Sequence, residues 1–116
     1  MEGWLEKQGH MFKTWKRRWV SLEPSGEDQN YYSFSYYIDE TKREKKGEFR
    51  IQLDSAVTNL EDGYSTGKSN LFVLQAEGHG KTFLMLSALS EEDKNSWILA
   101  IETAIDTLRS QAESNW

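Results

Sequence analysis

The sequence predicts a mostly β domain: a seven-stranded antiparallel, partly open barrel or sandwich capped by a C-terminal α-helix. Its 116 residues suffice for one domain with a single hydrophobic core. Seven stretches show strand-like patterning, and the segments between them are rich in turn-forming Gly, Asn, Asp and Ser. One apolar stripe at helical spacing follows the strands. A helix in that position is expected to cover an open end of a curled sheet.

The expected strands follow one another without an intervening helix, at about 2–8, 15–23, 30–39, 47–53, 55–60, 70–76 and 82–88. The clearest alternation lies in the third stretch, where one face carries Tyr32, Phe34, Tyr36 and Ile38. The fourth stretch shows the same pattern, with Phe49, Ile51 and Leu53 on one face. We expect these faces to point into the core.

The helix is expected to run from Ser90 to Leu108. Ser90 is a suitable N-cap, and Asp93 stands three residues later as in a capping box. The apolar stripe consists of Trp97, Ile101, Ala104, Ile105 and Leu108. We therefore expect a domain over residues 1–110, followed by a frayed tail at 111–116.

Composition excludes several classes of protein. The chain has no cysteine, so it forms no disulfide and no cysteine-based metal site. Its net charge of −5 argues against a general nucleic-acid binder. The two histidines, His10 and His79, stand beside glycine in expected loops with no clustered nucleophile or carboxylate, so we expect no metal, no cofactor and no enzyme. No signal peptide or apolar stretch near 18 residues occurs, and we expect a cytoplasmic protein.

One basic cluster stands out near the start of the chain. Residues 7–18 contain five Lys or Arg and no acid. Side chains alternate along a strand, so Lys7 shares the inward face with Leu5, and Lys16 and Arg18 share it with Val20. Basic groups on an inward face are costly unless an anion compensates them. The inward position of these three basic side chains predicts a site for a polyphosphate head group.

Three groups of residues resemble the pleckstrin-homology (PH) domain family. They are Gly3-Trp4-Leu5-x-Lys7, then Lys16-x-Arg18-Trp19 after eight intervening residues, and the inward Trp97 of the closing helix. The spacing from Lys7 to Arg18 resembles the basic signature of PH domains that recognise 3-phosphorylated phosphoinositides. The run Lys13-Thr-Trp-Lys-Arg-Arg-Trp19 is similar to that of the cytohesin/general-receptor-for-phosphoinositides group, and the early segment and helix end are similar to protein kinase B.

The resemblance implies roles for individual residues. In such domains Lys7, Lys16 and Arg18 would grip the inositol phosphates at the open end of the barrel. The hydroxyl group of Tyr36, with Tyr37 as the alternative, would donate a hydrogen bond to a phosphate. A further basic contact corresponds best to Lys46 and next to Lys45. Two departures weaken the match: Met11 replaces a basic contact of some relatives, and Glu44 lies in a long loop beside the site. Contacts from the other strands are assigned only as candidates, which are Lys68, Asn70 and Lys81.

The function that the resemblance implies is recruitment of a larger signalling protein to the plasma membrane through PtdIns(3,4,5)P3 or PtdIns(3,4)P2. We expect Met11 and Phe12 to contact the bilayer interface, with Lys13 and Arg17 attracted by anionic lipid. Phe12 folded back onto Trp15 remains an alternative.

A protein-interaction module of the same fold, with weak or no lipid specificity, is the alternative function. Its binding residues would be exposed aromatic side chains, namely Tyr31 and Tyr37, or Trp4 and Trp15. The inward basic cluster favours the lipid, because a peptide groove has no need of it.

Overall fold

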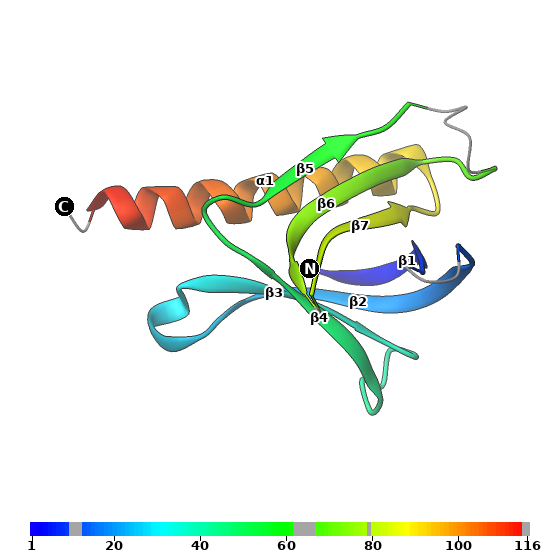
Figure 1. Cartoon of the computed structure of the whole chain (residues 1–116), viewed down its shortest axis with the longest axis horizontal. Helices are drawn as coiled ribbons and strands as arrows, with labels where there is room; N and C mark the ends of the chain where they lie inside the picture. Colours follow the sequence, from blue (N-terminus) through cyan, green and yellow to red (C-terminus); the bar gives the residue numbers. More distant parts are fainter. Residues whose placement is uncertain (10–12, 62–66, 79, 115–116) are drawn as a thin grey trace.

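The computed structural model describes residues 1–9, 13–61, 67–78 and 80–114 (Figure 1). In this part of the chain seven strands precede one α-helix, α1 (Glu91–Ser114). The strands are β1 (Glu2–Gln8), β2 (Trp15–Ser25), β3 (Tyr31–Tyr37), β4 (Lys45–Ile51), β5 (Ala56–Asn59), β6 (Leu71–Gly78) and β7 (Lys81–Ser87). A short 3-10 helix, η1 (Glu27–Gln29), connects β2 to β3. The predicted fold class is confirmed.

All seven strands form one antiparallel sheet in the order β4-β3-β2-β1-β7-β6-β5. The sheet curls until β4 meets β6 through the pair Arg50 and Glu77, which partly closes the barrel. At this contact a Cβ atom on Gly78 would lie 2.6 Å from the carbonyl oxygen of Glu48. A side chain there would push β4 and β6 apart, so the closure depends on glycine.

The helix α1 lies against β5 and β6 and supplies one wall of the core (Figure 1). Trp97 is fully buried and packs edge-on against Phe34 of β3, with ring centroids 6.0 Å apart. The predicted apolar stripe is confirmed, because its five members are all buried: Trp97, Ile101, Ala104, Ile105 and Leu108. Loss of a buried aromatic side chain of this kind typically costs about 3–5 kcal/mol.

The start of α1 is held by two polar contacts. Ser90 is the N-cap, as predicted: its Oγ accepts a hydrogen bond from the backbone N–H of Asp93 at 3.0 Å. Lys94, which the sequence pattern left unassigned, is 3 % exposed, and its Nζ donates to Asn59 Oδ1 at 2.8 Å and to the carbonyl of Leu60 at 3.3 Å. This lysine therefore connects the helix to the end of β5. Within the described residues, no helix combines the length and apolar character that crossing a bilayer requires.

Several expected boundaries were wrong. β3 ends at Tyr37, so Ile38 is not in the strand and is 39 % exposed. Leu53 likewise follows β4 and is 46 % exposed, because the chain turns there: Gln52 N–H donates to Ser55 Oγ at 2.8 Å. β4 begins at Lys45 rather than at residue 47.

The helix also extends beyond its predicted end. α1 continues to Ser114, so residues 111–114, expected to fray, are helical. The added turn contains good helix formers, Gln111, Ala112 and Glu113, which support its extension into solvent. Residues 115–116 lie outside the described part.

Candidate anion-binding site

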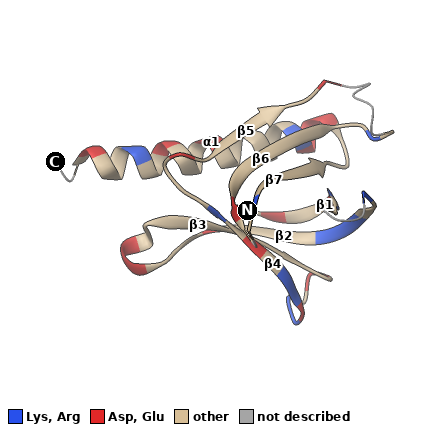
Figure 2. Cartoon of the chain, in the orientation of Figure 1, with Lys and Arg blue, Asp and Glu red and all other residues tan. Residues whose placement is uncertain are grey.

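The basic cluster of β1 and β2 lies at one end of the barrel, which we call the loop end. It is the end where the chain links β1 to β2, β3 to β4, and β6 to β7. Register places these links together, because Lys7 pairs with Lys16 of β2 and with Leu86 of β7, and all neighbouring strands are antiparallel. Figure 2 shows Lys and Arg along the first part of β2 and at the start of β4.

Lys7 is the central residue of the cluster. Its side chain is half-buried, and its Nζ lies 4.9 Å from the centroid of the Tyr36 ring. Burial lowers the pKa of Lys7, and the positive charges of Arg18 and Lys16 lower it further. The three basic side chains are thus close enough to repel one another. Among the described residues, no salt bridge reaches Lys7.

Tyr36 forms the floor beside this cluster. It pairs with Val20 of β2 and is only 7 % exposed, so its side chain faces the interior. Burial raises the pKa of Tyr36, and the nearby charge of Arg18 opposes that shift. Its neighbour Tyr37, the alternative from the sequence, pairs with Trp19 on the outward-facing register. The geometry therefore places Tyr36, and not Tyr37, next to Lys7 and Arg18.

The other two basic residues are more accessible than Lys7. Lys16 is exposed, and Arg18 is partly exposed. The Nη1 of Arg18 donates to the carbonyl of Arg17 at 3.0 Å. A guanidinium group carries five N–H donors, so this one bond leaves donors available for a bidentate contact with phosphate.

The expected contact from β4 is not assembled in this structure. A register shift between Tyr36 and Tyr37 places Lys45 opposite Tyr37, so the start of β4 departs from simple alternation. Lys46 Nζ forms an ion pair with Glu44 Oε2 at 2.9 Å. Exposed pairs of this kind contribute at most about 1 kcal/mol, so Lys46 is easily released.

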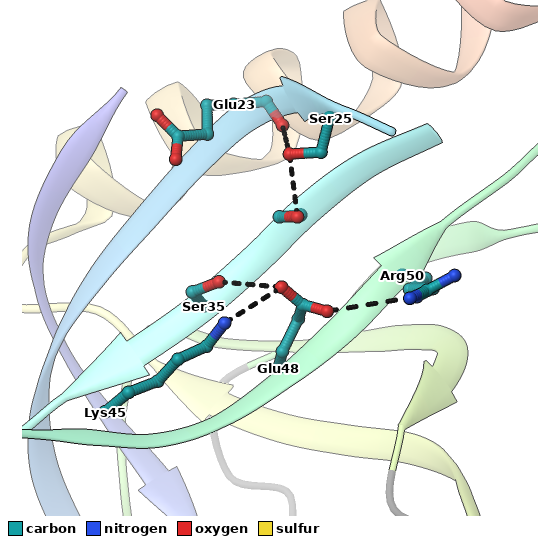
Figure 3. Close-up of polar contacts among 7 residues, drawn as sticks. Glu23, Ser25, Ser35, Lys45, Glu48 and Arg50 are labelled. Carbon is teal, nitrogen blue, oxygen red and sulfur yellow. Dashed lines mark hydrogen bonds and ion pairs between the residues drawn. The ribbon is translucent and has the colours of Figure 1, made fainter. Parts of the chain in front are cut away.

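Lys45 instead joins a polar cluster on the outer face of β3 and β4 (Figure 3). Its Nζ donates to Glu48 Oε1 at 3.0 Å, and Ser35 Oγ donates to the same oxygen at 3.3 Å. Burial alone would raise the pKa of Glu48, but these hydrogen bonds and the charge of Lys45 lower it overall. Arg50 lies at 3.8 Å from the other carboxylate oxygen. Lys45 is thus committed to the outer face.

Two of the four residues expected to contact a membrane are described by the structure, Lys13 and Arg17. Lys13 is exposed in the link between β1 and β2. Arg17 points outward, where its guanidinium lies 4.9 Å from the ring centroid of Trp4. Met11 and Phe12 lie outside the described residues.

Of the candidates from the remaining strands, two have structural partners. Lys68 Nζ forms a 2.9 Å ion pair with Glu6 Oε2, and Asn70 Nδ2 donates to the carbonyl of Ala88 at 3.3 Å. Lys81 is exposed at the first position of β7, at the loop end.

A feature that the sequence analysis missed is an apolar groove beside the loop end. It has a volume of about 320 Å³ and is lined by Gln8, Gly9, Lys13, Val73, Phe83 and Met85. Phe83 is 55 % exposed. The run Phe83-Leu-Met-Leu86, which is apolar on both faces of a strand, is the sequence signal that could have revealed it.

The fold, a curled seven-stranded sheet with a C-terminal helix, is that of a binding module of the PH type. The chain belongs to the PH domain family, whose model matches residues 1–106. This family consists of non-catalytic binding modules.

The curated relatives of the chain are much longer than it is. The chain is 33 % identical over 108 residues to Switch-associated protein 70 from Bos taurus, covering 93 % of this chain and 16 % of that protein. It thus spans about a sixth of the length of the curated relatives that it matches.

Among solved structures, it is similar to the C-terminal PH domain of pleckstrin in complex with D-myo-Ins(1,2,3,5,6)P5, with 26 % identity and a TM-score of 0.73 over 90 % of this chain and 93 % of that one. A second complex of that domain, with D-myo-Ins(1,2,3,4,5)P5, has 28 % identity and a TM-score of 0.67 over 90 % and 95 %.

Proposed function

We propose that this domain binds phosphoinositides, PtdIns(3,4,5)P3 and/or PtdIns(3,4)P2, and so recruits a larger signalling protein from the cytoplasm to the plasma membrane. The observation that carries the proposal is the position of Lys7. It is half-buried beside Arg18 and Lys16; burial lowers its pKa, and the charges of these two residues lower it further. A polyphosphate at the loop end would turn this repulsion into attraction.

The basic side chains would contact the phosphates in different ways, according to their shapes. Arg18 forms a bidentate contact with one phosphate, while Lys7 and Lys16 act as point charges on the others. Each charge-assisted hydrogen bond contributes roughly 1.5–3 kcal/mol. The Tyr36 hydroxyl donates a hydrogen bond to a phosphate oxygen, and burial, which raises the pKa of Tyr36, favours this protonated form. Lys46 reaches the head group after leaving Glu44.

The membrane surface would add a second, less specific contribution. Lys13 and Arg17 near an anionic leaflet are each worth about 1 kcal/mol. Met11 and Phe12 complete the expected contact at the bilayer interface. The domain is thus a peripheral binding module without catalytic activity of its own. The inositol pentakisphosphate complexes of the similar pleckstrin domain support a head group of this class.

Calorimetric titration of the domain tests the proposal directly. We expect inositol 1,3,4,5-tetrakisphosphate to bind more tightly than inositol 1,4,5-trisphosphate, and Arg18→Ala to weaken binding about 10- to 100-fold. Arg50→Ala is the matched control, because this arginine lies on the outer face beside Tyr31. Unchanged binding by Arg18→Ala would refute the site, and flat traces from folded wild-type protein would refute the function.

A protein-interaction module is the second candidate, and one observation favours it. Trp4 and Trp19 form an edge-to-face pair on the outer face of β1 and β2, with centroids 5.3 Å apart, and Arg17 lies over Trp4. Aromatic residues and arginine of this kind are enriched in protein interfaces. Flat titrations with both inositol phosphates would favour this outer surface as the binding site.

A further inference from the structure

The outer face of β6 and β7 carries an apolar patch, which we call the apolar shoulder: Val73, Phe83 and Met85. Val73 pairs directly with Met85 across the two strands, and both are half-buried. Phe83 is 55 % exposed, although the neighbouring Leu84 and Leu86 fill the core. Although Gln75, the pair of Phe83, is polar and exposed, the outer face carries three apolar side chains here, and a strand with one solvated face is normally polar there.

The apolar shoulder adjoins the basic site. Leu86 pairs with Lys7, and β7 runs antiparallel to β1. Phe83, three residues before Leu86, consequently lies nearer than Lys7 to the link between β1 and β2. The groove of about 320 Å³ joins the shoulder to that link through Gln8, Gly9 and Lys13.

The charge that lines the groove is of one sign. None of its lining residues is acidic, and Lys13 is the one charged residue among them. The neighbouring segment 7–18 holds five basic residues and no acid. The carboxylate of Glu6, which pairs with Ser87 of β7, lies close to the groove but is ion-paired with Lys68 at 2.9 Å. An apolar surface edged by lysine matches the boundary between anionic head groups and acyl chains.

We infer that the apolar shoulder inserts into the interface of an anionic bilayer when the head group occupies the basic cluster. This inference rests on the proposed function and adds a second, apolar anchor to it. Phe83 is the main anchor, because an aromatic ring removes more apolar surface from water than Val73 or Met85. The shoulder, together with Lys13, orients the loop end against the membrane.

Vesicle binding separates this anchor from the head-group site. The probe is phosphatidylcholine vesicles that contain phosphatidylserine and PtdIns(3,4,5)P3, compared with soluble inositol 1,3,4,5-tetrakisphosphate. We expect Phe83→Ser to bind the vesicles about tenfold more weakly and to bind the soluble head group as wild type does. Leu99→Ser is the matched control: it removes an apolar side chain that is 65 % exposed on α1, and vesicle binding should not change.

Each outcome has a distinct meaning. Equal vesicle binding by wild type and Phe83→Ser would overturn the insertion and leave the head-group site intact. If wild type does not bind the soluble head group, the proposed function is overturned, and the inference with it. If Phe83→Ser also loses soluble head-group binding, the test is repeated with Met85→Ser. Vesicle binding by Met85→Ser as tight as that of wild type would then overturn the inference. Sedimentation of the same variants covers the remaining case, because a dimer that Phe83→Ser dissociates would assign the shoulder to a second copy of the chain.

Discussion

Two lysines in different environments of the domain show how differently the fold treats the same side chain. Lys94, at the helix, is 3 % exposed and has polar partners on β5 and just beyond it. Lys7, at the loop end, is half-buried beside two other cations, and its pKa is lowered by burial and by their charges. Lys94 therefore stabilises the fold through its hydrogen bonds, whereas the charge of Lys7 is unfavourable in the free domain and would be stabilised by a bound anion. Unfavourable electrostatics in a folded domain of this kind is a sign of a binding site.

Of the changes that test this contrast, removal of the Lys94 side chain should have the largest effect on the free energy of unfolding. Lys94→Ala leaves Asn59 Oδ1 and the carbonyl of Leu60 without their donor, and we expect a loss of about 2–3 kcal/mol in the free energy of unfolding. Urea denaturation measures it. Lys81→Ala, which removes an exposed lysine, should change stability by less than about 0.5 kcal/mol. Equal stability of both variants would contradict a structural role for Lys94.

Removal of Lys7 should have the opposite effect on stability. Lys7→Met ends the repulsion with Lys16 and Arg18 and keeps the volume of the side chain, and we expect a gain of about 0.5–1 kcal/mol in the free energy of unfolding. The same change should weaken inositol 1,3,4,5-tetrakisphosphate binding about 10- to 100-fold. Lys45→Met, on the outer face, should not affect binding. A less stable Lys7→Met would show that the cluster is not strained in the free domain.

The pH dependence of stability should give the smallest effect. Because the pKa of Lys7 is lowered below its ordinary value of 10.5, the unfolded chain binds more protons than the folded one between the two values. The Lys7 contribution to stability therefore rises as pH rises through that window. Tyr36, whose pKa is raised, contributes the opposite slope above about pH 10.

Comparison of wild type with Lys7→Met isolates the lysine, since both proteins keep Tyr36. Urea denaturation in steps from neutral pH to pH 10 should show their difference in stability narrowing as Lys7 loses its proton. A constant difference would mean that charge repulsion is not its cause.

Much of the architecture was predictable because local patterns and global packing agree. Alternation with period two in 30–39 identified Tyr36 as inward-facing, and the same argument placed Lys7, Lys16 and Arg18 on one face before any pairing was known. The helix followed from Ser90 and the stripe around Trp97, since a cap and a 3.6-residue period are properties of a single segment.

Other features depend on segments that are remote in sequence. A register shift beside Tyr36 moved Lys45 to the outer face, and no local pattern indicates such a bulge. The pattern of the helix left Lys94 unassigned, because its partner Asn59 lies 35 residues earlier in the chain.

Alternation and spacing therefore carried the fold class, the inward faces and the basic cluster, because each is a property of consecutive residues. Which charges are compensated and which apolar side chains stay exposed arose from the pairing of distant strands. In the part of the chain that the structure describes, Lys7 has no ion-pair partner, and β2 and β3 bring Arg18 and Tyr36 to it instead. Phe83 lies on the face of β7 opposite to the buried Leu84 and Leu86. The burial and the electrostatic environment of a side chain are set by its neighbours in space, and the pairing of strands that are distant in sequence determines which residues those neighbours are.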